Sequence, residues 1–449
     1  MRNDAMKKRH PQKQAENRWQ KPARLLLTLS LLLSGVACTT EEVEDRFEES
    51  ASARLASTLD HARRVLRSAP YGWEFDYYPG ATAAYGGLVY TVRFDSLTAT
   101  VGCSLIADST VTSHYRLTND SGPVLTFDTY NDLFHYYSTP SSSEYEAKGG
   151  EFEFVIDSIA DDLITLSGKK TGNAMYLRRL SAAADDYASK TIDIFDHFVD
   201  SLSGTIGTAA VRAKCNPSAR SLTAITGTDT ASIRYAYTNR GIRLHQPWHV
   251  GGVSVQAFDF DTQSGQLSCT DPGTTGITLQ GFPYSSDFMS YPRYEGDYIL
   301  SYDAYNVDVH LAPNRLEGTY LLEGLSEKYS LVLHYDSDTG NLLLGSQVVG
   351  ESQGRPVYWV CYDYENGYLS LNDEGQFTIS WNGNRFYPRF NFSTTNANVL
   401  NCTGGLLIYL FYNADGNLAA GILDDPEWLT NGTMQFRDLK SLNRRTRME

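Results

Sequence analysis

Aromatic side chains gather at three places in the sequence, and they are its strongest chemical signal. The three segments are His245–His249, Tyr358–Tyr368 and Phe134–Pro140. Tyrosine and tryptophan rings beside carboxylate and amide acceptors suit sugar rings or peptide backbones, because they supply contact area at a low cost in conformational entropy. Packing in the core is the alternative role in an aromatic-rich β protein. The candidate ligand-binding aromatics are Trp248, Tyr358, Trp359, Tyr362, Tyr364, Tyr136 and Tyr137.

The surroundings of these rings predict where they lie. His245–His249 is expected in or beside a loop between two strands, and Phe134–Pro140 is expected to open a serine-rich loop. Tyr358, Tyr362 and Tyr364 are expected to share one face of a strand, because side chains alternate along a strand.

The patterns of the common metal and catalytic sites are absent. The sequence contains no HExxH, GxSxG, GxGxxG or GxxxxGK,. His245 and His249 have Pro247 between them in a strand-like segment, which argues against a helical zinc pair. Asp336–Asn341 resembles the start of a calcium loop, but Gln347 stands at the twelfth position, and a β-turn explains the segment better. We therefore expect no metal and no cofactor.

An unrecognised pair of carboxylates is the remaining route to an enzyme. A glycosidase needs two carboxyl groups at a set separation across a cleft. The chain carries 51 acidic side chains after residue 37, and the sequence nominates no pair among them. Catalytic residues are therefore left open, with a hydrolase as the alternative to a binding protein.

The charge balance excludes one class of partner. The 449 residues include 53 acidic and 38 basic side chains, a formal net charge of −15. Eight basic and two acidic side chains precede residue 38, so the rest of the chain has 30 basic and 51 acidic side chains and a net charge of −21. A body this acidic repels phosphates, and we expect no nucleic-acid partner.

The N-terminus has the pattern of a bacterial lipoprotein signal peptide, residues 1–37. A basic stretch precedes the apolar segment Leu25–Ala37, which is too short to cross a bilayer,. The ending Ser34–Cys38 resembles a lipobox, although Gly35 stands where leucine is commonest. Cys38 is therefore the expected lipid anchor, and the membrane is a partner through its acyl chains.

The acidic run Glu41–Asp45 follows directly after Cys38. It resembles the export signal that sends Bacteroidota lipoproteins to the outer face of the outer membrane. A periplasm-facing lipoprotein is the alternative, because acidic residues also favour the N-terminus of a helix. We expect an outer-membrane lipoprotein exposed at the cell surface.

The elements that must position the aromatic residues are mostly strands. An amphipathic helix is expected over 41–68 and a second over 185–202, because apolar residues recur there at spacings of three and four. Elsewhere short alternating runs are separated by Gly, Ser, Asn and Asp turns. The fold class is mainly β with a minor α+β character, built of antiparallel sandwich-like or barrel-like units.

Composition divides the body into units. We expect a helix and sheet unit closed by a helix over 38–203, a β unit over 204–285, an antiparallel β unit over 286–436 and a frayed tail over 437–449. Five cysteines follow Cys38, widely spaced and without a CxxC pair, which favours small buried hydrophobic side chains over a dense disulfide framework. They are Cys103, Cys215, Cys269, Cys361 and Cys402.

Four segments together resemble a Bacteroidota lipoprotein family catalogued as domain of unknown function 4302. These markers are Ser68–Gly80, Gly122–Asn131, Leu166–Asn173 and Thr238–Leu244, and the resemblance covers most of the mature chain. Such families often accompany TonB-dependent transporters, so the resemblance implies capture or processing of an extracellular nutrient. It brings no established catalytic residues.

The anchor, the aromatic segments and the missing catalytic motifs predict a non-catalytic accessory lipoprotein of a nutrient-uptake system. Its expected ligand is an extracellular glycan, a peptide or a partner protein, with an outer-membrane transporter complex as a possible partner. Two alternatives stay open: a hydrolase with an unrecognised carboxylate pair, and a purely structural or interaction subunit.

Overall fold

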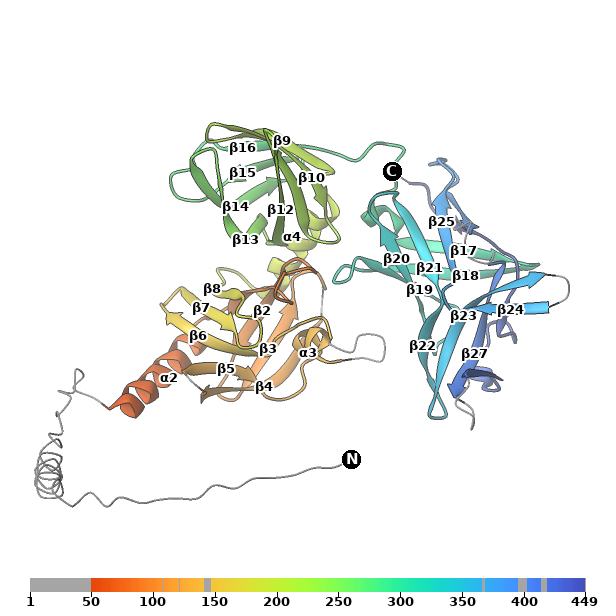
Figure 1. The fold of residues 1–449 in the computed structure, drawn as a ribbon, viewed down its shortest axis with the longest axis horizontal. Helices are drawn as coiled ribbons and strands as arrows, with labels where there is room; N and C mark the ends of the chain where they lie inside the picture. Colours follow the sequence, from red (N-terminus) through yellow and green to blue (C-terminus); the bar gives the residue numbers. More distant parts are fainter. Residues whose placement is uncertain are drawn as a thin grey trace, which may run out of the picture. The chain divides into compact units, whose positions relative to one another are not determined.

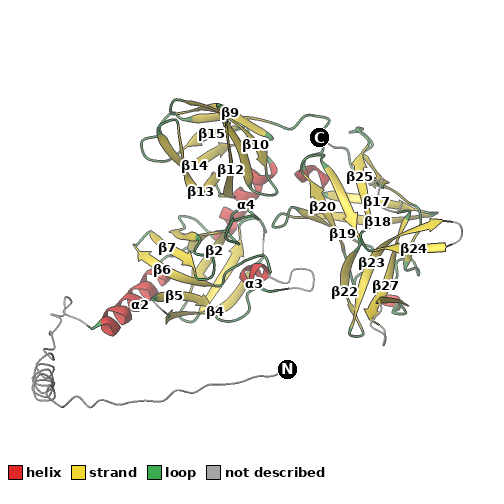
Figure 2. Ribbon diagram, in the orientation of Figure 1, coloured by secondary structure: helices red, strands yellow, loops and turns green. Residues whose placement is uncertain are grey.

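The computed structural model of the chain describes residues 50–107, 109–120, 122–140, 147–365, 368–394, 402–412 and 418–448. The predicted signal peptide and the predicted anchor Cys38 lie outside these residues. Strands dominate the described chain (Figure 2), which confirms the predicted mainly β class. They form three closed antiparallel barrels and one further sheet (Figure 1). No helix among the described residues combines the length and the apolar character that crossing a bilayer requires.

The first barrel is a meander in which each strand pairs with the next and the last strand closes onto the first. Its strands are β1 (Trp73–Tyr77), β2 (Leu88–Phe94), β3 (Thr98–Cys103), β4 (Thr110–Asn119), β5 (Pro123–Phe127), β6 (Glu153–Ile159), β7 (Leu163–Gly168) and β8 (Ala174–Arg179). Closure pairs Trp73 of β1 with Arg179 of β8. Closing the sheet removes the unpaired edges that an open sheet exposes.

Helix α2 (Ala51–Arg67) precedes the first barrel and packs one side against it. Val65 and Leu66 are buried, and the indole Nε1 of Trp73 donates a hydrogen bond to the Leu66 carbonyl at 2.8 Å. The helix agrees with the later part of the predicted helix 41–68, whose first residues lie outside the described chain.

A short helix, α3 (Asp132–Ser138), packs its buried side chains Phe134 and Tyr137 against the core of the first barrel. The Asn131 side chain caps it by accepting from the backbone N–H groups of Leu133 and Phe134, a preferred N-cap arrangement. Phe134 is fully buried, with its ring 4.3 Å from that of Phe127. Most of the segment expected to open a serine-rich loop is therefore helical, because the cap starts a helical turn and the apolar Phe134 packs inside the barrel. The serine-rich residues 141–146 lie outside the described chain.

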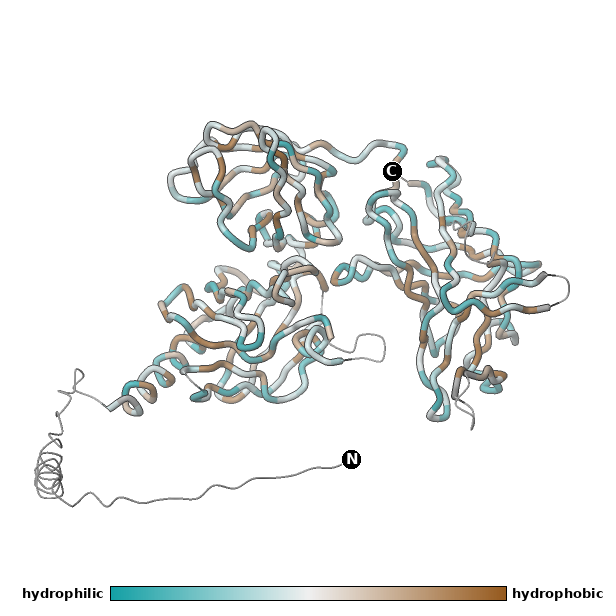
Figure 3. Tube along the Cα trace, viewed as in Figure 1, coloured by the Kyte–Doolittle hydropathy of each residue, from teal (hydrophilic) through white to brown (hydrophobic). Residues whose placement is uncertain are grey.

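The second barrel has the same meander order. Its strands are β9 (Ser201–Ile206), β10 (Ala209–Asn216), β11 (Ser221–Thr226), β12 (Asp229–Tyr237), β13 (Gly241–Val250), β14 (Val253–Asp261), β15 (Gln266–Cys269) and β16 (Thr278–Phe282). β16 closes onto β9. In β10 the buried Val211, Ala213 and Cys215 alternate with exposed Arg212 and Lys214. Figure 3 shows that hydrophobic and hydrophilic residues are mixed along the chain in all the barrels.

Helix α4 (Ala184–Asp196) links the first two barrels and is shorter than the predicted helix 185–202. Phe198 follows the helix, and its ring lies 5.2 Å from that of Tyr237 inside the second barrel. Leu202 belongs to β9, so the boundary expected after residue 203 falls within a strand. The apolar spacing continued past the helix because β9 also points its leucine inward.

The third barrel takes its strands from more distant parts of the sequence. They are β17 (Gly296–Tyr302), β18 (Tyr305–Asn314), β19 (Thr319–Glu323), β20 (Leu331–Asp336), β21 (Asn341–Gly345), β25 (Gln376–Trp381), β26 (Arg389–Ser393) and β30 (Leu439–Arg444). The 3-10 helix η1 (Tyr291–Tyr294) places two buried tyrosines against its core.

The predicted frayed tail 437–449 is wrong for its central part. β30 pairs with β17 and β26 and closes the third barrel. Leu442 is fully buried, and the Arg444 guanidinium donates to the carbonyls of Arg293 and Glu295 at 2.7 Å each. The basic composition suggested solvent exposure, but a barrel needs this strand to leave no open edge.

The remaining sheet is joined to the third barrel through the chain. It contains β22 (Gln347–Ser352), β23 (Arg355–Glu365), β24 (Tyr368–Asn372), β27 (Gly404–Tyr412), β28 (Leu418–Ile422) and β29 (Gln435–Phe436), with the 3-10 helix η2 (Pro426–Trp428) beside it in sequence. Its core includes Trp359 of β23, whose ring lies 4.9 Å from that of Phe436.

Candidate functional site

Strand β1 is buried on both faces. This is unusual, because the polar outer face of a barrel strand is normally exposed to solvent. Trp73, Phe75 and Tyr77 point into the first barrel, whereas Glu74 and Asp76 lie on the opposite face by strand alternation. Glu74 is 8% exposed and Asp76 is 1% exposed. Buried carboxylates are costly unless charged or hydrogen-bonding partners compensate them.

Arginine side chains from two barrels supply this compensation. Arg243 of β13 donates to Glu74 Oε1 and to Asp76 Oδ1, each at 2.7 Å. Arg178 of β8 forms an ion pair with the other oxygen of Asp76. Burial lowers the pKa of Arg243, but the Asp76 and Glu74 carboxylates outweigh this effect and hold the pKa above its usual value. The four charges therefore form a neutral cluster that joins the second barrel to the first.

Tyr187 of α4 adds a hydrogen bond to the same cluster. Its hydroxyl donates to Glu74 Oε2 at 2.8 Å. Burial, and then the charge of Glu74, raise the pKa of Tyr187 well above its usual value. The hydroxyl therefore keeps its proton and acts as a donor, so both oxygens of Glu74 are engaged.

An aromatic pair lies beside the cluster. The rings of Tyr78 and His245 stack at 4.1 Å with an angle of 27°, and the Tyr78 hydroxyl donates to the Arg243 carbonyl at 3.2 Å. Burial lowers the pKa of His245, and the nearby Asp76 only partly opposes this. A neutral imidazole is the state that suits this half-buried stack.

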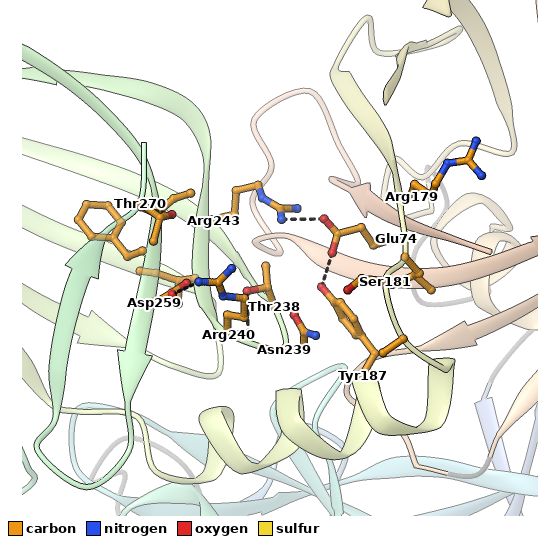
Figure 4. Close-up of a pocket in the computed structure, with 15 residues that line it drawn as sticks. Glu74, Arg179, Ser181, Tyr187, Thr238, Asn239, Arg240, Arg243, Asp259 and Thr270 are labelled. Atoms are coloured by element: carbon orange, nitrogen blue, oxygen red, sulfur yellow. Dashed lines mark hydrogen bonds and ion pairs between the residues drawn. The ribbon is translucent and has the colours of Figure 1, made fainter. Parts of the chain in front are cut away.

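A cleft of about 240 Å³ opens next to these residues (Figure 4). We call it the polar cleft, because most of its lining side chains carry hydroxyl, amide or charged groups. They include Glu74, Arg179, Ser181, Tyr187, Thr238, Asn239, Arg240, Arg243, Asp259 and Thr270. Figure 4 shows the Arg243 guanidinium and the Tyr187 hydroxyl converging on Glu74, with Arg240 directed to Asp259.

The short turn between β12 and β13 forms one wall of the polar cleft. The Thr238 hydroxyl accepts from the backbone N–H groups of Arg240 and Gly241 at 3.3 and 3.2 Å. This local bond leaves Asn239 at the tip of the turn, half-buried at the cleft. Threonine and asparagine are favoured in such turns because their side chains bond nearby backbone groups.

The charges of the polar cleft are already satisfied within the protein. Glu74 and Asp76 bind arginine, and Asp259 pairs with Arg240. The hydrolase alternative would need two free carboxyl groups that face each other across the cleft. Glu74, Asp76 and Asp259 do not supply such a pair, because each is bound to arginine. Among the described residues, no group of three or more His, Cys, Asp or Glu side chains is arranged to hold a metal ion. The cleft offers hydrogen-bonding groups, with no unpaired charge at its floor.

The predicted aromatic residues do not gather at one site. Trp248 lies on strand β13, where the register with β14 shifts between Arg243 and Trp248. It is half-buried and packs against the main core. His245–His249 therefore lies beside a loop and not in one, because the break in register accommodates Pro247 within the strand, which ends just before the turn at residues 251–252,.

The tyrosine-rich segment as far as Glu365 belongs to strand β23, as its alternation predicted, and Tyr368 begins β24. Trp359 is fully buried and Tyr362 is 1% exposed, so both pack in the core. Tyr358 is half-buried, and Tyr364 is 58% exposed. The three tyrosines thus share a strand face but differ in accessibility along it, and none of the four lines the polar cleft.

Tyr136 and Tyr137 are adjacent on α3 and have different surroundings. Tyr136 is 38% exposed, and the Lys148 ammonium lies 4.0 Å from its ring centre. Tyr137 is 2% exposed and lines a second cavity, near Arg220. Of the predicted aromatics, Tyr137 is the one that borders either cavity described here.

Sequence reasoning missed the charged cluster, although it had singled out the segments that build it. Glu74 and Asp76 lie in the marker Ser68–Gly80, and Arg243 lies in the marker Thr238–Leu244. These segments are more than 150 residues apart in sequence and meet through the Arg243 ion pairs. The alternation of acidic and aromatic residues in β1 was the available signal, because it places two carboxylates on one face.

Comparison with known protein families places two models on the chain, and the boundary between them falls inside the second barrel, between β14 and β16. A family model described as domain of unknown function, DUF4302, matches residues 43–262, and a second domain of unknown function, DUF4987, matches residues 270–408. The predicted resemblance is confirmed over the first of these ranges. No curated protein matches the sequence.

Proposed function

We propose that this protein has an accessory role, the binding of an extracellular glycan. The chain belongs to the DUF4302 family over its first barrel and most of its second. The observation that carries the proposal is the polar cleft, whose hydrogen-bonding groups come from both of these barrels while its charges are paired internally. A neutral, hydroxyl-rich ligand matches such a lining, because it exchanges hydrogen bonds without leaving a charge uncompensated.

The anchor part of the proposal rests on the N-terminal sequence. The lipobox-like ending before Cys38 supports diacylation, which holds a protein stably in one leaflet,. The acidic run Glu41–Asp45 supports placement on the outer face of the outer membrane. An outer-membrane transporter complex is the partner that would take up the bound nutrient.

Labelling with an alkyne fatty acid tests the anchor. Wild-type protein should incorporate the label and partition with membranes, whereas Cys38→Ser should do neither. Protease treatment of intact cells then tests the orientation, since a surface-exposed chain is degraded and a periplasm-facing chain is protected. Label on Cys38→Ser would contradict the anchor, and protection would contradict surface exposure.

Calorimetric titration of the full protein against neutral oligosaccharides and peptides tests the binding. Asn239→Ala in the polar cleft should weaken binding of the recognised glycan about fivefold, because one hydrogen bond contributes roughly 1 kcal/mol. Asn119→Ala, at the exposed end of β4, is the matched control and should leave binding unchanged. Equal binding by both variants would place the ligand elsewhere, and binding of peptides alone would replace the glycan proposal.

The hydrolase alternative draws no support from the acids of the polar cleft. Glu74 is held by Arg243 and Tyr187, and Asp76 is held by Arg243 and Arg178. We therefore propose binding at this site rather than general acid–base chemistry.

A further inference from the structure

A second cavity of about 330 Å³ is separate from the polar cleft. We call it the Arg220 cavity. Segments of all three barrels line it, including the loop before β2, helix α3, the β10–β11 turn and the β18–β19 turn. Its size lies in the range of small-molecule sites, roughly 300–1,000 Å³.

Arg220 is a buried cation without a carboxylate partner among the described residues. Its side chain is 2% exposed, and its guanidinium donates to the carbonyls of Tyr85, Leu316 and Arg315 at 2.6, 3.1 and 3.2 Å. Carbonyl dipoles solvate a guanidinium but carry no net charge. Buried charges are normally paired, because removing an ion from water is expensive.

Two glycines allow the neighbouring loops to approach this turn closely. A Cβ on Gly86 would lie 2.5 Å from the Arg220 Cβ, and a Cβ on Gly318 would lie 2.6 Å from the Ser218 Cβ. Both glycines have positive φ angles, 69° and 67°, which other residues rarely adopt,. The Arg220 cavity is therefore formed by defined backbone turns.

Unpaired polar atoms concentrate at this cavity. Nine buried side-chain nitrogen or oxygen atoms lack a hydrogen-bond partner in the described chain, and three of them belong to residues that line it. The three are Arg220 Nε, Ser218 Oγ and Thr319 Oγ1. Buried polar groups are otherwise almost always bonded, so such a group calls for an explanation, for example a bound molecule.

The other charged residues of the lining leave the net charge positive. Lys148 forms an ion pair with Glu317 at 2.8 Å, so these two charges cancel. Burial, and then the charge of Lys148, lower the pKa of His334, which favours the neutral imidazole. Among the charged side chains that line the cavity, only the Arg220 guanidinium has no opposite charge in the described chain to balance it.

Aromatic rings complete the lining. The rings of Tyr85 and Tyr137 meet edge-on at 5.9 Å, and Tyr85 is 37% exposed. Tyrosine faces of this kind pack against the C–H face of a sugar ring while hydroxyls nearby exchange hydrogen bonds.

We propose that the Arg220 cavity binds a small hydroxylated carboxylate, of which a sugar acid is the representative. The ligand carboxylate balances the Arg220 guanidinium, and its hydroxyl groups bond Ser218 and Thr319. This inference does not rest on the proposed function, because the polar cleft takes a neutral ligand at different residues.

Titration of the full protein with D-glucuronate and with D-glucose tests the charge requirement. Glucuronate should bind and glucose should not bind detectably, because only glucuronate has the carboxylate. N-acetylglycine, a carboxylate without hydroxyl groups, should bind more weakly than glucuronate. Equal binding of glucose, equal binding of N-acetylglycine, or no binding of glucuronate would each overturn the proposal.

Variants that leave the Arg220 carbonyl contacts in place assign the site. Ser218→Ala and Thr319→Val should each weaken glucuronate binding about fivefold, as expected for one lost hydrogen bond. Ser254→Ala, at an exposed position of β14, is the matched control and should bind as wild type does. Arg220→Lys, which keeps the charge but not the carbonyl contacts, should also weaken glucuronate binding, because lysine lacks the unpaired Nε–H donor,. If Ser218→Ala and Thr319→Val both bind like Ser254→Ala, glucuronate binds elsewhere and the assignment is wrong.

The polar-cleft variant separates the two proposals. Asn239→Ala should leave glucuronate binding unchanged, because Asn239 does not line the Arg220 cavity. Loss of glucuronate binding in Asn239→Ala would move the acid site to the polar cleft and overturn the present inference. Failure of the neutral glycan to bind would leave the glucuronate result unaffected.

Discussion

Arg243 and Arg220 are both arginines of the second barrel that reach other parts of the fold, and they are balanced in different ways. Arg243 meets two carboxylates at 2.7 Å each, and Tyr187 and Arg178 complete that cluster. Arg220 meets three backbone carbonyls and no carboxylate among the described residues. The first arrangement is electrically complete, whereas the second leaves a positive charge beside a cavity.

This difference separates a structural role from a binding role. A closed ion-pair cluster gains nothing from a charged ligand, so the polar cleft beside it suits neutral molecules. A guanidinium that is solvated by carbonyls alone can gain the Coulomb energy of an added anion. Charge pairing, and not the presence of arginine, therefore distinguishes the two cavities.

The largest expected effect is on Arg243. Arg243→Met leaves Glu74 without an arginine partner and Asp76 with Arg178 alone. The two carboxylates remain buried, so water does not make up for the lost positive charge. We expect a loss of about 3–5 kcal/mol in the free energy of unfolding, the usual cost of breaking a buried pair. Urea unfolding measures it. Arg212→Met, at an exposed position of β10, is the control and should change stability by less than about 0.5 kcal/mol,. An equal effect of the two substitutions would remove the structural role of the cluster.

Arg220→Met should have a smaller effect on stability. It removes three hydrogen bonds to carbonyls, but it also removes a buried charge that has no carboxylate partner. We expect a loss of about 1–3 kcal/mol, the cost of leaving carbonyl groups unsatisfied. The same urea experiment tests this, and a loss larger than that of Arg243→Met would reverse the comparison between the two arginines.

Added ligand should sharpen the contrast. In saturating glucuronate, the melting temperature of wild type should rise, because a ligand that binds only the folded state stabilises it. At a concentration of about 100 times the dissociation constant the gain is about 2.7 kcal/mol. Arg220→Met should lose this gain, whereas Asn239→Ala should keep it. A wild-type melting temperature that glucuronate does not move would count against the Arg220 cavity as a site.

Tyr187→Phe should cost about 1 kcal/mol. It removes the hydrogen bond from the hydroxyl to Glu74, but Glu74 lines the cleft, where water can replace the donor,. Thermal or urea unfolding of the variant measures the cost. Tyr305→Phe, on an exposed side chain of the third barrel, is the matched control and should show no loss. A cost as large as that of Arg243→Met would mean that the cluster depends on the hydroxyl as much as on the guanidinium.

The smallest effect is expected from pH. The pKa values of His245 and His334 are lowered in the folded protein, in both cases chiefly by burial. The unfolded chain therefore binds protons more readily as the pH falls below the ordinary histidine pKa, about 6.5, so folded stability should decline from pH 7.5 towards 5. Melting curves at these pH values test the sign. His245→Gln should flatten part of the decline, and an unchanged slope would show that His245 does not contribute.

The sequence predicts individual strands better than it predicts which residues pack against each face of a strand. The alternation in Tyr358–Tyr364 correctly indicated a strand, yet it did not reveal that Trp359 and Tyr362 are core residues. Alternation reports which residues share a face, and burial depends on what packs against that face. For the same reason the aromatic segments were plausible binding sites in sequence but do not meet in the fold.

The C-terminal segment is a second case in which local sequence did not predict burial. Its basic residues predicted a solvated end, while its apolar Leu439 and Leu442 are core residues of β30. Closure of the third barrel requires a strand between β17 and β26. That requirement depends on residues more than 130 positions away in sequence, so local composition cannot express it.

Strand β1 shows the difference between what local sequence predicts and what depends on distant parts of the fold. The alternation in its sequence requires that Trp73, Phe75 and Tyr77 share one face and that Glu74 and Asp76 share the other, because the strand period is two. The burial of the acidic face depends on tertiary packing, since its partner Arg243 comes from a strand more than 160 residues later. Likewise, nothing in the sequence singled out Arg220, whose charge is enclosed by loops that pack against it from the other two barrels. Local alternation follows from backbone geometry, whereas the pairing or isolation of a charge depends on which distant surfaces exclude water from it.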